Sequence, residues 1–217
     1  MEMTPYKSKT NAQTVIALDA MGGDFAPEEV VLGAASVASP SLKILLVGHA
    51  ADIERCLAKA DPRCRQYVEI VIASQVIGFD EEPTRAVRTK KDSSLVVACR
   101  EVSEGRADGV VSAGNTGAIL AAAMLNLKRR RGLKRPGLCA VLPTPNKPTI
   151  FIDVGANSTV RPLHLLEFAN MASIFAQDVL DVRDPSVGLL SIGEESIKGD
   201  ELVLEAHRLM AESSFLD

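Results

Sequence analysis

The chain has 217 residues, of which 47% are hydrophobic and 24% charged, and its formal net charge is −4 at pH 7. This length and composition suit one large or two small globular domains with a substantial core. The negative charge, with aromatics at 4% and no tryptophan, argues against a nucleic-acid partner, because such proteins gather basic residues and stack aromatic rings on bases. No stretch approaches the roughly 20 apolar residues of a membrane-spanning helix. We therefore expect a soluble protein, with attachment to a membrane surface as an open alternative.

The N-terminal stretch MEMTPYKSKTNAQ is polar and lacks the apolar centre of a signal peptide or membrane anchor. It predicts a flexible tail over residues 1–12, followed by an α/β domain over 13–217.

The four cysteines form no CxxC pair and are not placed with enough histidines to suggest a metal site. Cys99 and Cys139 lie in apolar runs and are expected to be small buried hydrophobic residues. Such free cysteines suit a reducing cytoplasm, so we expect a cytoplasmic protein.

Seven short runs are rich in Val, Ile and Leu: TVIALDA, LKILLVG, VEIVIAS, GVVSAG, LCAVLPT, TIFIDVG and VGLLSIG. Nearly continuous apolar runs are typical of strands covered on both faces. Most intervals between them have helical periodicity, over residues 27–39, 52–59, 94–104, 117–130, 162–180 and 200–212. This alternation predicts an α/β fold with a mostly parallel sheet between helical layers.

Polar, glycine-rich motifs follow four of these strands: DAMGGD, SAGNTGA, DVGANST and SIGEESIKGDE. Ligands of open α/β sheets bind outside the carboxyl ends of the strands. We therefore expect the four motifs to line one cleft.

The motif SAGNTGA covers residues 112–118. Gly114 permits unusual backbone torsions, Asn115 or Thr116 could cap the following helix, and a ligand could approach the chain closely at Gly117. The hydroxyls of Ser112 and Thr116 would complete an anion cradle. The alternative is a tight turn with a good helix cap. It is not a Walker A motif, because no Gly-Lys-Ser/Thr follows.

Two later motifs offer further groups. In DVGAN, Asp153 could orient a neighbouring donor, Gly155 lies in the loop, and Asn157 could donate to a developing oxyanion. A structural Asx turn is the alternative. In GEESIKGDE, Lys198 could supply a point charge for phosphate, unless the charges of this loop simply pair with one another in water.

Two basic stretches allow two interpretations each. In VRTKKDSS, Asp92 or Ser93 could be a helix cap, while cations such as Lys91 collected before a helix start favour a bound anion. KRRRGLKR, residues 128–135, ends a predicted helix and could be a solvated face. Arg129, Arg130 and Arg131 could instead dock an acidic partner or an anionic membrane.

The three histidines belong to no recognised nucleophile motif, and G-x-S-x-G is absent from the sequence. An enzyme with these residues would position two substrates and stabilise charge rather than supply a covalent nucleophile.

Five motifs in this order closely resemble the bacterial phosphate acyltransferase family: ALDAMGGDFAPE, IGFDEEPTRAVRTKKDSS, SAGNTGAILAAA, IDVGAN and GLLSIGEESIKGDE. The resemblance runs from about Val15 to the end of the chain. It implies attack of inorganic phosphate on the thioester of a long-chain acyl-acyl carrier protein, which gives acyl phosphate for phospholipid synthesis.

The resemblance also implies a three-layer α/β/α fold similar to isopropylmalate dehydrogenases and phosphotransacetylases. It implies a homodimer, peripheral contact with the inner face of the membrane, and delivery of acyl phosphate to a glycerol-3-phosphate acyltransferase. No cofactor is implied.

Residue chemistry suggests roles within this reaction. The turn at Gly22 and Gly23 would bring backbone close to substrate, while Asp19 and Asp24 organise neighbouring groups. Phosphate would be held by Ser112, Asn115 and Thr116, helped by Lys91 or Lys198, and Ser93 and Gly114 belong to the same substrate- or phosphate-binding set. The assigned catalytic candidates are Asn115, Asn157 and Lys198, with Asp153 and Gly155 in the substrate-binding set.

Two departures from the family pattern stand out. Family members usually carry Asn where this chain has Asp200, and they continue well past residue 217, so we expect a C-terminally shortened chain. An acyl-coenzyme A-dependent phosphotransacylase remains an alternative. So does a non-catalytic domain that binds carrier protein or a partner.

Overall fold

The structure is a computed structural model that describes residues 13–129, 133–145, 148–193 and 198–213. The chain divides into one compact unit within Lys7–Lys128 and another within Arg129–Asp217.

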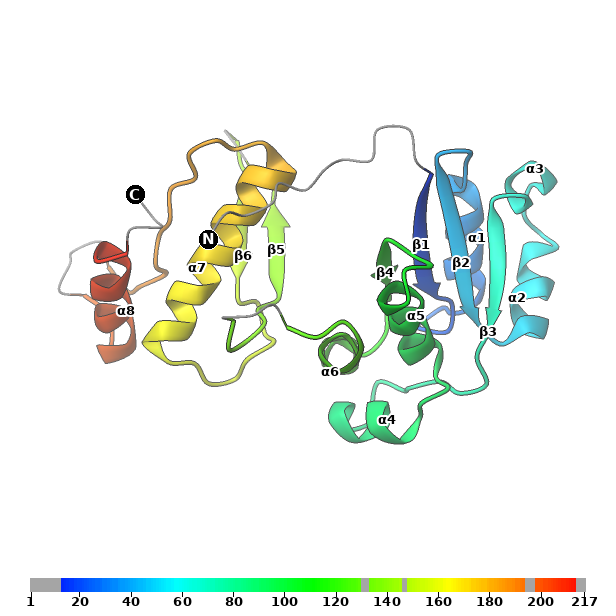
Figure 1. Cartoon of the computed structure of the whole chain (residues 1–217), viewed down its shortest axis with the longest axis horizontal. Helices are drawn as coiled ribbons and strands as arrows, with labels where there is room; N and C mark the ends of the chain where they lie inside the picture. Colours follow the sequence, from blue (N-terminus) through cyan, green and yellow to red (C-terminus); the bar gives the residue numbers. More distant parts are fainter. Residues whose placement is uncertain (1–12, 130–132, 146–147, 194–197, 214–217) are drawn as a thin grey trace. The chain divides into compact units, whose positions relative to one another are not determined.

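The first unit is built on a four-stranded sheet whose neighbouring strands are all parallel (Figure 1). Its strands are β1 (Thr14–Asp19), β2 (Leu42–Gly48), β3 (Val68–Ile72) and β4 (Gly109–Val111), in the spatial order β3-β2-β1-β4. The chain moves outward from β1 to β3 and then returns to the other side of β1. The strand order therefore reverses between β1 and β4, which is where sheets of this kind bind ligands.

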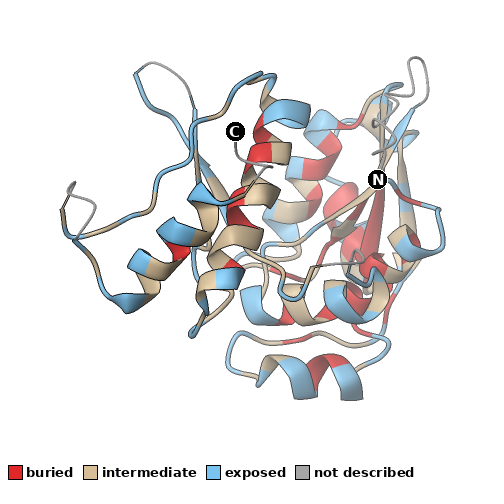
Figure 2. Ribbon diagram, turned by 60° about the vertical axis from the view of Figure 1, so that its left-hand side comes forward, coloured by how far each residue is buried: buried red, intermediate tan, exposed pale blue. Residues whose placement is uncertain are grey.

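Both faces of this sheet are buried, because alternate side chains of a strand point to opposite faces. Ile44 and Leu46 of β2 pack with helices α1 (Glu28–Val37) and α2 (Ala50–Leu57). Leu45 and Val47 pack instead with helix α5 (Ser94–Ser103). Figure 2 shows the buried residues gathered in these strands and on the helix faces turned toward them.

A second layer covers the outer side of α5. Helices α4 (Pro83–Thr89) and α6 (Thr116–Asn126) join α5 in one apolar cluster that includes Val87, Val96 and Ala122. The short helix α3 (Pro62–Arg65) leads into β3. The helices α4 and α6 thus fix the loops that follow β3 and β4.

The second unit contains a two-stranded antiparallel sheet, β5 (Cys139–Leu142) and β6 (Thr149–Ile152). Helix α7 (Pro162–Leu180) packs against β6 and against helix α8 (Glu201–Ala211). Phe168 of α7 is 1% exposed and is the largest fully buried side chain among the described residues.

The α/β class with a mostly parallel sheet between helices is confirmed, and three details of the prediction are wrong. The runs that form β5 and β6 pair antiparallel with each other in a separate sheet. The run VGLLSIG forms no strand, and Leu190 and Ile192 are 87% and 88% exposed. A strand needs a neighbour for its backbone groups, and this run has none among the described residues. Finally, Cys99 is buried as expected, but Cys139 is exposed because it lies in a thin two-stranded sheet.

No helix among the described residues is long and apolar enough to cross a membrane.

Candidate active site

Two strand ends meet where the strand order reverses. Asp19, the last residue of β1, is 3% exposed, and its Oδ2 accepts a hydrogen bond of 2.8 Å from the Ser112 hydroxyl just after β4. The Met21 N–H donates to Oδ1 at 3.2 Å. The Ser112 oxygen in turn accepts from the Gly114 N–H at 3.1 Å. A buried carboxylate is therefore held by one hydroxyl and one backbone amide, and it connects the loops after β1 and β4.

Gly22 lies directly against this cluster. A Cβ at Gly22 would lie 2.6 Å from Asp19 Oδ2, 2.9 Å from Ser112 Oγ and 3.0 Å from the Gly114 nitrogen. Gly23 has a φ of 126°, which disfavours any residue with a side chain. The Gly-Gly turn thus allows the loop after β1 to touch the loop after β4.

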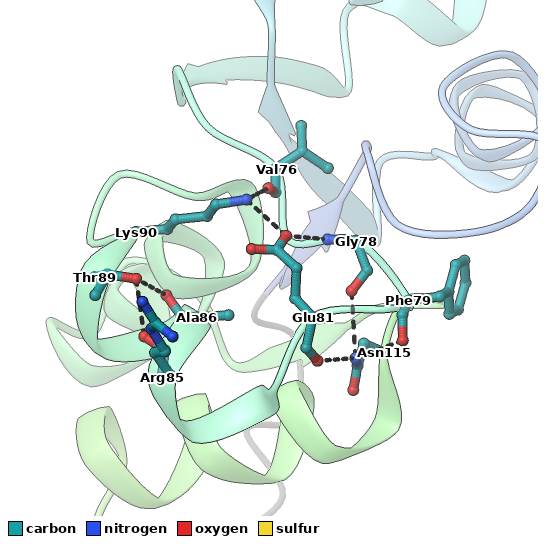
Figure 3. Close-up of polar contacts among 9 residues, drawn as sticks. All are labelled: Val76, Gly78, Phe79, Glu81, Arg85, Ala86, Thr89, Lys90 and Asn115. Carbon is teal, nitrogen blue, oxygen red and sulfur yellow. Dashed lines mark hydrogen bonds and ion pairs between the residues drawn. The ribbon is translucent and has the colours of Figure 1, made fainter.

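Asn115 connects these loops to a third. Its Oδ1 accepts from the Ala118 N–H at 3.0 Å, so Asn115 is the N-cap of α6. Its Nδ2 lies 3.2–3.3 Å from the carbonyl oxygens of Gly78, Phe79 and Glu81 (Figure 3). Both ends of the amide are therefore engaged, and the geometry gives Asn115 a positioning role.

Lys90 and Glu81 hold the same third loop. The Lys90 ammonium donates to Glu81 Oε1 at 2.6 Å and to the Val76 carbonyl at 2.8 Å, and Glu81 also accepts from the Gly78 N–H at 2.7 Å (Figure 3). The hydrogen bond from Lys90, with that from Gly78, lowers the pKa of Glu81 below its ordinary value.

The neighbouring lysine is different. Lys91 is exposed, and its ammonium has no partner among the residues that the structure describes. The ammonium of Lys91 is therefore available to an anion. The next residue, Asp92, accepts hydrogen bonds from both the hydroxyl and the N–H of Ser74, which ties this segment to the carboxyl end of β3.

Ser93 is fully buried and caps α5, where its hydroxyl accepts from the Val96 N–H at 3.4 Å. The capping interpretation of this stretch is thereby confirmed.

Gly117 has a packing role, because a Cβ there would lie 2.6 Å from Cγ of Pro83. Close approach of a ligand is not what demands glycine at this position.

Thr116 is the exposed first residue of α6, and its hydroxyl has no partner within the described part of the chain. The first N–H groups of a helix lack partners within the helix and favour anions. Thr116 and Lys91 are thus open donors on the first unit, and Asp24 is an exposed carboxylate in the loop after β1.

In the second unit, Asp153 organises the DVGAN turn. Its carboxylate accepts from the N–H groups of Leu138, Ala156 and Asn157 at 2.7–3.0 Å, and from Asn157 Nδ2 at 3.0 Å. Desolvation opposes ionisation here, but these hydrogen bonds outweigh it and lower the pKa of Asp153. Gly155, with a φ of 124°, completes the turn.

Asn157 is engaged on both sides. Its Nδ2 donates to the Pro136 carbonyl at 2.9 Å and to Asp153, while its Oδ1 accepts from Arg135 Nη1 at 3.2 Å. Arg135 also donates to the Thr159 carbonyl at 3.2 Å. The DVGAN turn is therefore an ordered structural unit that carries a guanidinium.

The remaining predicted residues lie elsewhere in the second unit. Lys198 is exposed and close in sequence to Asp200, the N-cap of α8. Arg129 donates to the Lys134 carbonyl, and Arg130 and Arg131 lie outside the described residues. That the second unit's motifs share a cleft with the first unit's stays a prediction.

Sequence reasoning missed Glu81, Lys90 and Arg135 as organisers of these loops. Each contacts groups between nine and 24 residues away along the chain. Such pairs have no local periodicity, so nothing in the sequence separates them from ordinary surface charges.

Comparisons with known proteins agree with this architecture. The chain matches the family model described as fatty acid synthesis protein over residues 14–216. It is 51% identical over 199 residues to a phosphate acyltransferase of Heliobacterium modesticaldum, which covers 91% of this chain and 59% of that relative. A phosphate acyltransferase of Nitratidesulfovibrio vulgaris is 49% identical over 197 residues, covering 90% of this chain and 57% of the relative.

The chain thus spans about three fifths of the length of these curated relatives. Among solved structures, EutD phosphotransacetylase from Staphylococcus aureus matches with a TM-score of 0.67 over 92% of this chain and 64% of that one. At 20% sequence identity, this likeness supports the fold alone.

Proposed function

Because the chain belongs to the fatty acid synthesis protein family, we propose that it transfers a long-chain acyl group from acyl-acyl carrier protein to inorganic phosphate. The product is acyl phosphate for phospholipid synthesis. The names of its relatives support acyl transfer to phosphate, and the carrier protein as acyl donor is our extension.

The observation that carries the proposal is the contact of Ser112 with buried Asp19 where the strand order reverses. This contact orders the start of α6, where the Thr116 hydroxyl and the N–H groups of Thr116 and Gly117 have no partner among the described residues, while Asn115 caps the Ala118 N–H. Donors of this kind suit a small anion such as phosphate. Lys91 adds an exposed positive charge at the carboxyl edge of the same sheet.

The chemistry requires no nucleophile from the protein. An oxygen of hydrogen phosphate forms a bond to the thioester carbonyl carbon, and the carbon–sulfur bond breaks after the tetrahedral intermediate. The thiolate of the carrier takes the proton that phosphate loses, so the products are acyl phosphate and free thiol. The protein's contribution is to hold phosphate and thioester together and to stabilise the oxyanion.

The contacts of the described residues suggest two different roles, phosphate binding and positioning. We assign phosphate binding to Thr116, the α6 amides and Lys91, and we assign positioning to Asp19, Ser112 and Asn115. Ser112 already donates to Asp19, so it acts through the carboxylate and the Gly114 amide rather than on phosphate itself.

Asn157 remains our candidate for the thioester oxygen, and it would need to release the Pro136 carbonyl to donate. Lys198 remains a second candidate cation. A homodimer, peripheral membrane contact and transfer of product to a glycerol-3-phosphate acyltransferase belong to this proposal. So does a cytoplasmic location.

The test is acyl-phosphate formation by the 217-residue chain, trapped as hydroxamate with hydroxylamine. Acyl-acyl carrier protein and acyl-coenzyme A are compared as donors, each with and without phosphate. Phosphate-dependent hydroxamate from the carrier-protein thioester is expected, with about a tenfold fall in Thr116→Val, the loss that one charge-assisted contact would cause.

Lys43→Met is the matched control, because Lys43 pairs with Glu69 near the opposite edge of the sheet. Equal activity of wild type and Thr116→Val would refute the assigned phosphate site. A preference for acyl-coenzyme A would refute the carrier protein as donor. No hydroxamate from the folded chain would refute the proposal for this chain.

A further inference from the structure

Two exposed aromatic rings border the candidate site. Phe25 is 76% exposed and Phe79 is 57% exposed. They follow β1 and β3, in the loops that lead to α1 and α4. Among residues 13–129, no other aromatic side chain is exposed to this degree, since Tyr67 is partly buried. Both exposed rings therefore lie at the carboxyl edge of the parallel sheet.

The backbone of the loop around Phe79 is held by hydrogen bonds, so the position from which the exposed ring projects is fixed. Asn115 binds the carbonyls of Gly78, Phe79 and Glu81, and Glu81 binds the Gly78 N–H. Ile77 is 8% exposed and anchors the loop in the core. Figure 3 shows the Phe79 ring pointing away from Glu81 and Lys90, outside the polar network.

The loops that carry the two rings are linked to the candidate site through Gly114 and Asn115, which are consecutive in the chain. Asn115, which holds the Phe79 loop, directly follows Gly114, which donates to Ser112. A Cβ at Gly114 would lie 3.4 Å from the Cα of Gly22, so the loop that carries Phe25 meets Gly114 as well. The two aromatic loops thus contact the same short segment as the buried Asp19.

We propose that Phe79, assisted by Phe25, forms an apolar contact for the acyl chain of the thioester substrate and determines preference for long chains. This inference rests on the proposed function. A phenyl ring in water gains free energy when a methylene chain covers it, and each methylene adds to the gain. A hexanoyl chain offers few methylenes beyond the carbonyl, whereas a dodecanoyl chain can cover the ring.

The test is calorimetric titration of the 217-residue chain with dodecanoyl-pantetheine and hexanoyl-pantetheine. Each thioester is used below the concentration at which it forms micelles. We expect Phe79→Ala to weaken the binding of dodecanoyl-pantetheine about tenfold, which is the effect of exposing about two methylene groups to water. The same variant should weaken the binding of hexanoyl-pantetheine by less than about twofold. Phe79→Leu retains apolar area and should keep most of the chain-length preference.

Val37→Ala is the matched control. Val37 is also 57% exposed, but it ends α1 beside the start of β2, at the opposite edge of the sheet. It should leave binding of both thioesters unchanged. Thermal unfolding of each variant shows that the protein titrated is folded.

The outcomes separate this inference from the proposed function. If folded Phe79→Ala keeps the chain-length preference of the wild type, the role of Phe79 is overturned, even if the wild type forms hydroxamate. Lost preference in that variant would support it even if no hydroxamate forms. Failure of the wild type to bind either thioester would also overturn it. So would loss of co-sedimentation with phosphatidylglycerol vesicles in Phe79→Ala at unchanged thioester binding, because the ring would then be a membrane contact.

Discussion

The Ser112 hydroxyl donates to the buried Asp19 carboxylate across 2.8 Å, although 93 residues separate the two in the chain. The contact joins the ends of β1 and β4 at the point where the strand order reverses. It makes one unit of a carboxylate, a hydroxyl and the Gly114 amide, each of which would be costly to bury alone.

Removal of this hydroxyl should destabilise the fold. Ser112→Ala leaves the buried Asp19 carboxylate with one fewer donor, and we expect a loss of about 1–3 kcal/mol in the free energy of unfolding. Urea denaturation followed by circular dichroism measures it. Ser36→Ala is the control, because Ser36 donates only to Gly33 on an exposed helix surface. Equal stability of the two variants would show that Asp19 does not depend on Ser112.

Two glycine substitutions should act in opposite directions. Gly22→Ala places a methyl group 2.6 Å from Asp19 Oδ2, and we expect a loss of about 1–3 kcal/mol from overpacking. Gly33→Ala, in helix α1 with no atom within 4 Å of the new methyl group, should stabilise by up to about 1 kcal/mol. Thermal and urea unfolding would reveal the contrast, and a neutral Gly22→Ala would contradict the close approach of the loops.

Adjacent lysines should have separable effects. Lys90→Met removes the partner of Glu81, so it should lower the Tm and raise the pKa of Glu81. The depressed pKa of Glu81 contributes stability above its ordinary value of 4.5, and that contribution is lost as pH falls through the folded pKa. The difference in Tm between wild type and Lys90→Met should therefore shrink in acid.

Lys91→Met should leave the Tm unchanged, because its ammonium has no partner within the described chain. It should weaken phosphate binding about three- to tenfold, as expected for loss of one exposed charge. Thermal unfolding with increasing phosphate measures both properties. The assignment of Lys91 fails if phosphate protects wild type and variant equally.

The turn at Asp153 predicts a pKa response. Asn157→Ala removes one donor to the carboxylate, so the pKa of Asp153 should rise toward 3.8 while its backbone donors remain. Because the folded pKa is depressed, stability from Asp153 is present above the unfolded value and is lost as pH falls. Carbon-13 NMR titration of the carboxyl groups measures the shift. Asn126→Ala, whose amide binds only its own helix, should leave Asp153 unchanged.

Two cysteines should differ in reactivity. Burial, with the nearby negative charge of Asp19, raises the pKa of Cys99 to about 11, whereas Cys139 is exposed. Alkylation near neutral pH requires the thiolate, so Cys99 should react about a hundredfold or more slowly than Cys139. Mass spectrometry of iodoacetamide-treated protein measures the rates. Rapid labelling of Cys99 in the folded protein would contradict its burial in the apolar cluster of α4, α5 and α6.

Much of the first unit followed from the sequence. The apolar runs that became β1 to β4 are buried on both faces because parallel strands bring helices to both sides, and that leaves a nearly continuous run of Val, Ile and Leu. The two caps could be narrowed to Asn115 or Thr116 and to Asp92 or Ser93, since a cap is a local interaction within four residues, and the structure selects Asn115 and Ser93. The carboxyl edge as the expected place of the candidate site followed from topology alone.

Only the tertiary structure decided which of those motif residues are engaged. Ser112 and Asn115 looked like free donors for phosphate, but their partners are Asp19 and the loop of Phe79, which are distant in sequence. The run VGLLSIG has the composition of a strand and forms none, because pairing depends on a neighbouring strand rather than on the run itself. Sequence determined the local elements, whose interactions are short-range, and the fold decided the contacts that bring distant loops together.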